Sequence, residues 1–109
     1  MNDLNSLIIE GTIIQQPTVT TAVTGQIAGR MEISVSRTYK NYAGAEVTET
    51  EEYPVECFGQ LAEFVRTKIN EKDKVRVVGR LKMNKWKDTD GKKHKSFVVL
   101  AEHVEHRKA

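Results

Sequence analysis

The segment QLAEFVRTKIN, from Gln60 to Asn70, is the stretch of this sequence that decides the fold. Its apolar residues recur at i, i+3, i+4 and i+8, which places them on one stripe of a short amphipathic helix. These residues are Leu61, Phe64, Val65 and Ile69. The segments on both sides show the period of two that is typical of β-strands, so the sequence predicts one helix within a series of strands.

Three predicted strands come before this helix. Residues 4–15 (LNSLIIEGTIIQ) are rich in isoleucine, and Gly11 predicts a bulge or a sharp bend within them. Residues 30–39 (RMEISVSRTY) alternate between apolar and polar side chains, as a half-buried strand does. The third strand covers residues 50–59 (TEEYPVECFG), where Pro54 lacks a ladder donor and predicts a sheet edge or a bulge.

Turn-forming residues separate these strands. Residues 15–29 are predicted to form a loop, because Pro17, Gly25 and Gly29 interrupt regular structure. Residues 40–48 (KNYAGAEVT) are predicted to turn the chain back from the second strand into the third.

Two further strands are predicted after the helix. Residues 74–86 (KVRVVGRLKMNKW) form the fourth, with a bulge expected at Gly79. The sequence DTDG at residues 88–91 predicts a turn, and residues 95–104 (KSFVVLAEHV) form the fifth strand. Five short strands with one helix between the third and the fourth is the order of the all-β OB-fold, a partly open Greek-key barrel. A ferredoxin-like domain would need a second helix between its early strands.

The size and composition fit one such domain over residues 1–109. Hydrophobic residues make up 39% of the chain and charged residues 29%, as in a globular protein. The longest apolar runs are far too short to cross a bilayer, and the first residues lack the basic start of a signal peptide. The single Cys57 is interpreted as a small buried hydrophobe in a reducing compartment, so the cytoplasm is the expected location.

The charges are unevenly distributed along the chain, although the formal net charge is only +2. Residues 43–57 contain five glutamates and no basic residue, whereas residues 66–95 contain twelve lysines and arginines against four acids. A basic half suits a polyanionic partner, and an acidic loop directs that partner away from one region. The alternative interpretation is an ordinary solvated surface.

Trp86 is the only tryptophan, and lysines lie on both sides of it. Counting by two along the fourth strand places Val75, Val77, Leu81 and Met83 on one face. The other face receives Arg80, Lys82, Asn84 and Trp86, provided that the pleat continues past Gly79. This face is polar and basic, which predicts that Trp86 is displayed on the surface; the alternative is a tryptophan that caps one end of the barrel core.

A displayed aromatic ring among lysines suits single-stranded nucleic acid, because every base has a face on which a ring stacks while lysines pair with phosphates. On an OB barrel the binding surface is the face of the second and third strands together with two hairpin loops. The candidates near those strands are Arg30, Arg37, Tyr39, Lys40 and Phe58. The candidates on the fourth strand and its hairpin are Arg80, Lys82, Lys85, Trp86, Lys87, Lys92, Lys93 and Lys95.

The sequence resembles the bacterial single-stranded DNA-binding protein family over nearly its whole length. The matching stretches are LNSLIIEGTIIQQPTV, FGQLAEFV, VRVVGRLKMNKWKDTDG and SFVVLAEHVE. The resemblance implies an OB-fold homotetramer that wraps and protects single-stranded DNA in replication, recombination and repair, in the cytoplasm and associated with the nucleoid. It also implies that Tyr39, Phe58 and Trp86 stack on bases.

The chain departs from the family pattern at three points. The family usually has another aromatic residue where this chain has Glu52, so Tyr53 either replaces it through a register shift or faces the other way. Tyr39 shares strand parity with the core-like Ile33, so its display is expected to need a twist or a bulge. The family typically ends in a flexible acidic tail that binds replication and repair proteins, and the sequence to residue 109 lacks one, so such partners are expected only where a native chain carries the tail.

No cofactor, metal or catalytic site is predicted. His103 and His106 lie on opposite faces of a strand, so they cannot share a metal, and the glutamates of TETEE have no accompanying nucleophile. Two alternatives to a general single-stranded DNA-binding protein stay open: a dimeric primosomal OB protein that bridges DNA to replication enzymes, and an OB domain that makes only protein–protein contacts.

Overall fold

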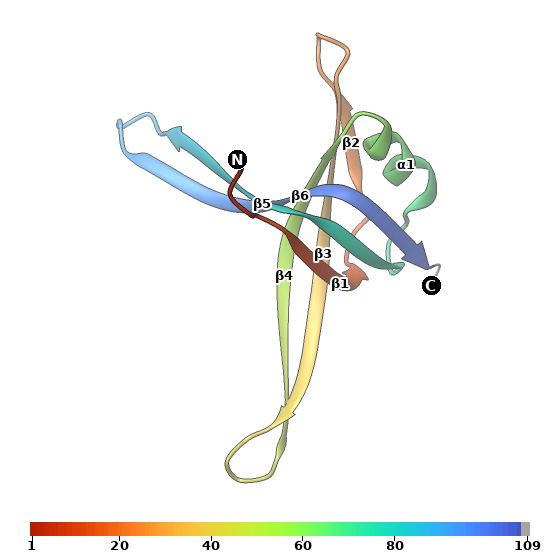
Figure 1. Ribbon diagram of the computed structural model, residues 1–109, viewed down its shortest axis with the longest axis vertical. Helices are drawn as coiled ribbons and strands as arrows, with labels where there is room; N and C mark the ends of the chain where they lie inside the picture. The colour runs from red at the N-terminus through yellow and green to blue at the C-terminus, as the bar shows by residue number, and fades with distance from the viewer. Residues whose placement is uncertain (108–109) are drawn as a thin grey trace.

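The computed structural model describes residues 1–107, and the last two positions of the predicted domain lie outside the described residues. These residues form six strands and one helix (Figure 1). The elements are β1 (Leu7–Ile13), β2 (Thr18–Thr21), β3 (Ile27–Lys40), β4 (Glu46–Phe58), α1 (Gln60–Lys68), β5 (Lys74–Lys87) and β6 (Lys93–Arg107).

Five of the strands close into a barrel. The sheet order is β1-β5-β6-β4-β3-β2, and β1 also pairs with β3, so the ring runs β1-β5-β6-β4-β3 and returns to β1. All pairs in the ring are antiparallel except β4 with β6, which is parallel and limited to Val55 with Val99 and Glu56 with Leu100. This topology, with α1 between β4 and β5, confirms the predicted OB-fold.

Gly11 directly precedes Thr12, the residue at which β1 changes partner. Residues 7–12 pair with β5, whereas Thr12 and Ile13 pair with β3. A Cβ atom at Gly11 would lie 2.4 Å from the Ser34 carbonyl oxygen, so only glycine permits this close approach of β1 to β3. The glycine at position 11 therefore allows β1 to lie close enough to β3 for the barrel to close. The pairing of β1 with β5 is regular through Gly11, so no bulge is present there.

The predicted loop over residues 15–29 is wrong at two places: residues 18–21 form β2, and residues 27–29 begin β3, with which β2 pairs. Pro17 does end one strand, but Thr18–Thr21 is a β-branched run with the edge of β3 available as a partner. Pro54 lies in unbroken register with β3, and β4 pairs with β6 only from Val55 onward, which confirms the predicted edge.

The irregularity predicted at Gly79 is present, but its extra residue belongs to β6. Val78 pairs with His103 and Gly79 pairs with Ala101, so Glu102 has no counterpart on β5. A Cβ atom at Gly79 would lie 2.1 Å from the Leu100 carbonyl oxygen, which explains the glycine at this position. The pairing of β5 with β6 is regular from Gly79 and Ala101 to Lys87 and Lys93, so the pleat of β5 continues toward Trp86.

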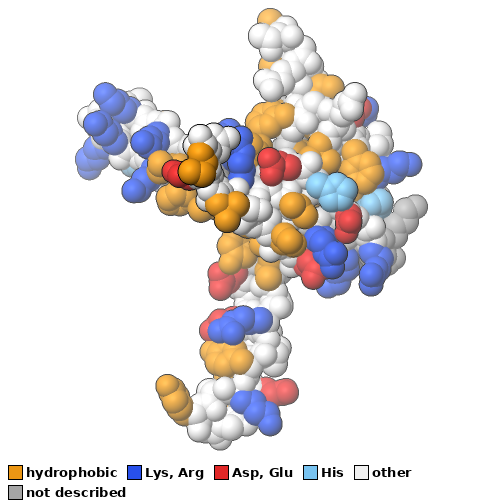
Figure 2. Space-filling model, viewed as in Figure 1, with side chains coloured by type: hydrophobic (Ala, Val, Ile, Leu, Met, Phe, Trp, Pro, Cys, Tyr) orange, Lys and Arg blue, Asp and Glu red, His pale blue; other side chains and the backbone are white. Residues whose placement is uncertain are grey.

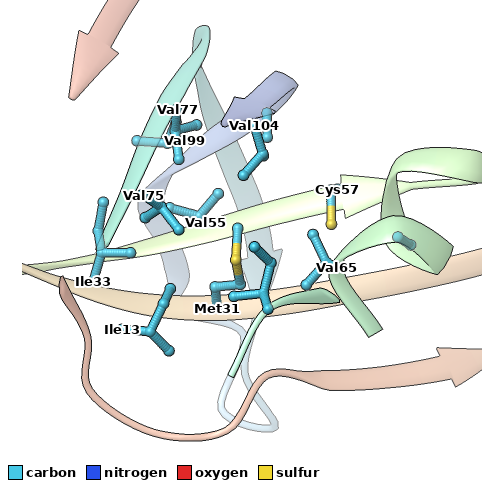
Figure 3. Close-up of a cluster of buried hydrophobic side chains, with 13 residues drawn as sticks. Ile13, Met31, Ile33, Val55, Cys57, Val65, Val75, Val77, Val99 and Val104 are labelled. Atoms are coloured by element: carbon cyan, nitrogen blue, oxygen red, sulfur yellow. The ribbon is translucent and has the colours of Figure 1, made fainter. Parts of the chain in front are cut away.

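The core fills the barrel and extends to α1 (Figure 3). Ala62 and Val65 of α1 are buried, Leu61 and Phe64 pack against the core, and Ile69 is buried directly after the helix, which confirms the predicted stripe. Cys57 is also fully buried, as predicted. Burial raises the pKa of its thiol to about 11, and a hydrogen bond with the Gly29 backbone opposes this only in part.

Two long hairpins leave the barrel in different directions (Figure 1). We call them the β3–β4 arm (residues 35–51) and the β5–β6 arm (residues 82–98), which lie beyond the pairs of β1 with β3 and of β4 with β6. Each turn is as predicted, with Gly44 and Gly91 in the left-handed backbone region at φ 79° and 81°. Within the described residues the single helix has nine residues, and no helix has the length and apolar character needed to cross a membrane.

Candidate nucleic-acid interface

Trp86 lies near the tip of the β5–β6 arm with 50% of its surface exposed, so the structure displays this ring outside the core. The face count predicted for β5 holds up to Val77, which is buried. Leu81 and Met83 continue the same face but are 46% and 42% exposed, because both lie beyond Gly79, where the pairing of β5 with β1 ends.

The turn after Trp86 is held by Asp88. One carboxylate oxygen accepts hydrogen bonds from the backbone N–H groups of Asp90 and Lys92, and the other lies 2.7 Å from Nε2 of His94. The hydrogen bond with His94, and after it those with the backbone, hold the pKa of the Asp88 carboxyl below its ordinary value. His94 in turn stacks on Trp86, with ring centroids 5.5 Å apart and planes inclined by 21°.

Five exposed lysines surround this tip, and Figure 2 shows basic side chains gathered at the end of the arm. They are Lys85, Lys87, Lys92, Lys93 and Lys95. Lys85 lies directly opposite Lys95, and Lys87 lies opposite Lys93, and like charges in such positions destabilise a strand pair. None of the five forms an ion pair with a carboxylate of the described residues. This uncompensated charge favours an anionic partner.

A surface hollow of ≈ 610 Å³ lies at the same tip. Its lining is Lys85, Trp86, Lys87, Lys93, His94 and Lys95. An aromatic ring and cations around one hollow can accept a base and its phosphate together.

A second group of predicted residues lies around Phe58, at the end of β4. Its ring is 37% exposed, and Lys82 Nζ lies 5.5 Å from the ring centroid. Glu56 lies 3.7 Å from both Lys82 Nζ and Arg30 Nη1, and Arg30 Nε also contacts Glu32 at 3.3 Å. The structure thus brings predicted residues from β3, β4 and β5 together around a carboxylate that the sequence reading did not single out.

Lys82 and Trp86 lie on the same face of β5, because they are four residues apart and the pairing between them is regular. This face connects the Phe58 group with the Trp86 group along the arm. Arg80 belongs to the same alternation and is exposed.

Tyr39 lies on the β3–β4 arm and is half-buried, and the strand pairing around it has no bulge. The pairing of β3 with β4 is continuous from Ala28 to Lys40, so Tyr39 keeps its parity with Ile33 but lies beyond the barrel. The Arg37 guanidinium carbon lies 4.7 Å from its ring centroid, and the Tyr39 hydroxyl donates to Glu49 at 3.0 Å. Arg37 also contacts Glu49. Figure 2 shows basic and acidic side chains along this arm.

Tyr53 faces the core, because the register of β4 does not shift. It packs against the buried cluster, and its hydroxyl donates to Glu51 at 2.7 Å, which raises its pKa. Glu52 pairs with Ser34 on the other face, so Tyr53 does not occupy the position expected of an aromatic there. Tyr42 at the tip of the β3–β4 arm, beside exposed Lys40, is fully exposed and was not predicted as a site residue.

The remaining histidines have separate partners. His103 lies 3.4 Å from Glu105, and His106 contacts Phe64 edge to face. A second hollow of ≈ 530 Å³, where β1, β3 and β5 meet, is lined by side chains of both charges, including Glu10, Arg76 and Glu105. Arg76 pairs with both of those glutamates.

A five-stranded barrel with exposed rings beside unpaired lysines defines the class: an OB-fold protein with the surface of a nucleic-acid-binding domain. The chain belongs to the Single-strand binding protein family, whose model matches residues 4–107.

Three relatives, each called single-stranded DNA-binding protein, show the same similarity. The chain is 29% identical to the protein of Thermotoga maritima over 101 residues, 26% identical to that of Fusobacterium nucleatum over 102, and 25% identical to that of Wolinella succinogenes over 101. These matches cover 93%, 94% and 93% of this chain. They cover 72%, 66% and 62% of the respective relatives.

Solved structures show the same fold at low sequence identity. The Plasmodium falciparum SSB in complex with ssDNA matches with a TM-score of 0.85 at 12% identity, covering 100% of this chain and 97% of that one. A deletion mutant of the Thermus aquaticus single-stranded DNA binding protein matches with a TM-score of 0.86 at 21% identity. This match covers 96% of this chain and 51% of that one. The small single-stranded DNA-binding protein of Streptomyces coelicolor matches with a TM-score of 0.74 at 22% identity. This match covers 98% of this chain and 96% of that one.

Proposed function

We propose that this chain binds single-stranded DNA without sequence preference and protects it during replication, recombination and repair. The observation that carries the proposal is the β5–β6 arm, where the exposed Trp86 ring lies among five lysines that have no carboxylate partner in the described residues. Rings stack on bases of any sequence, and lysines neutralise phosphates. Family membership and the names of the relatives support the same function.

Titration of the chain with oligothymidylate and oligoadenylate, each at several salt concentrations, tests this proposal. We expect Trp86 emission to be quenched by both oligomers and the affinity to fall with salt. Equally tight binding to a DNA duplex of the same length would contradict the proposal, because a duplex hides its base faces. An absence of binding to any oligomer would favour the alternative of an OB domain with protein partners only.

We further propose that the chain assembles as a homotetramer. The edge of β1 supports self-association, since its residues 7–11 pair with β5 on one side and have no strand partner on the other among the described residues. The solution mass with and without DNA tests this proposal. A mass of two chains would instead favour the dimeric primosomal alternative.

The proposal includes no catalytic step, since the family name describes binding. We place the protein in the bacterial cytoplasm with the nucleoid, in keeping with the bacterial relatives. Recruitment of replication and repair proteins through an acidic tail stays a prediction, which partner capture by chains with and without such a tail would test.

A further inference from the structure

His94 occupies one face of the Trp86 indole and is fixed in place from its other side. The two rings are 5.5 Å apart and nearly parallel, and His94 Nε2 lies 2.7 Å from Asp88 Oδ2. Asp88 is itself held by two backbone N–H groups of the turn. The chain therefore builds a ring stack, supported by a carboxylate, at the tip of its basic arm.

An indole has two faces, so a histidine stacked on one face leaves the other for a base. The same histidine can take up a proton, so it can add a positive charge to the DNA-facing surface. Charged groups surround it from every neighbouring segment. They are Lys85 and Lys87 of β5, Asp88, Asp90 and Lys92 of the turn, and Lys93 and Lys95 of β6.

We propose that His94 is a positioning residue for DNA binding, which orients the Trp86 ring for one-sided stacking and strengthens binding to single strands as it becomes protonated. This inference rests on the function proposed above. Protonation keeps the hydrogen bond that Nε2–H donates to Asp88 and adds a second N–H on the ring. The imidazolium then attracts the indole face as a cation and adds a positive charge beside the lysines. Affinity should consequently rise as the pH falls.

The test uses the free chain first, since Trp86 is its only tryptophan. Protonated imidazole in contact with indole quenches its emission, so the wild-type emission should fall between pH 8 and pH 5.5. The variant His94→Gln should lose this pH dependence. The matched control His103→Gln, which alters a histidine on the barrel that contacts Glu105, should keep the wild-type profile.

Binding is then measured with oligothymidylate, whose base does not take up a proton in this pH range. We expect the affinity of the wild type and of His103→Gln to increase about two- to fivefold from pH 8 to pH 5.5, the size of an exposed cation–π contact. His94→Gln should not show this gain. His94→Phe should bind more tightly than His94→Gln at pH 8, because it keeps the ring stack, and should also lack the gain.

Identical pH profiles of emission in the wild type and in His94→Gln would overturn the inference. A pH gain in affinity that persists in both His94 variants would overturn it as well. Failure of the proposed function is distinguishable, because the wild type would then bind no oligothymidylate at either pH while the emission profile of the free chain still differed between variants.

Discussion

Trp86 has an exposed ring whose loss should affect binding and leave the fold intact. Trp86→Ala should weaken binding to single strands of any sequence by about 1–3 kcal/mol, the contribution of one stacked base. Trp86→Phe should retain part of that affinity, since a smaller ring still stacks. Oligonucleotide titration and thermal unfolding check both variants. A loss of stability of about 3–5 kcal/mol without a change in affinity would instead identify a core tryptophan.

Glu56 is a residue whose removal should improve binding. Its carboxylate lies near Arg30 and Lys82, so a phosphate must compete with it for both cations. Glu56→Gln should therefore tighten binding. It should also steepen the slope of log affinity against log salt concentration by up to about 1.4, or about 0.7 for each released cation.

The matched control for this change is Glu10→Gln, which removes a carboxylate that pairs with Arg76 on the β1–β5 side of the barrel. Both variants raise the net charge by one. Equal effects on the salt dependence would show that net charge alone is responsible and that Glu56 does not compete with DNA.

At the scale of elements, the β5–β6 arm should supply most of the salt-dependent part of binding. Changing Lys92, Lys93 and Lys95 together to Gln should reduce the slope of log affinity against log salt concentration by up to about 2. Each neutralised phosphate contributes about 0.7 to this slope on single strands. The control changes Lys68 at the end of α1, Lys72 in the turn that follows and Lys74 at the start of β5 in the same way. An unchanged slope in the first variant, or equal slopes in both, would show that the arm does not contact DNA.

The elements themselves could be predicted wherever a local pattern determines them. The stripe of α1 and the turns at Gly44 and Gly91 depend on residues close together in the chain, and all are confirmed. Strand β2 was missed because it has only four residues and directly follows the breaker Pro17, although it forms a hairpin with the start of β3. The stacking of His94 on Trp86 has no periodic signal, since it depends on the register across the hairpin.

For the whole molecule, the order of strands and helix was sufficient to predict the OB-fold, because few barrels accommodate that order. The length of the arms was not predicted. Alternation predicts that Leu81 and Met83 continue a core face and that the display of Tyr39 needs a twist or a bulge, whereas both strand pairs extend past the barrel. Alternation within a strand shows which face a side chain occupies, but it does not show where the core ends.

The regular pairing of the β5–β6 arm makes its length a variable that is independent of the barrel. Side chains alternate between two faces, so inserting one residue in each strand, after Asn84 and before Ser96, should turn Trp86 to the opposite side from Lys82. Inserting two residues in each strand should restore its side at a greater reach. We expect quenching by DNA to be lost in the first variant and kept in the second, with unchanged barrel melting in both. Over evolution, such an arm can therefore lengthen only by an even number of residues in each strand if the Trp86 ring is to keep facing the bound DNA.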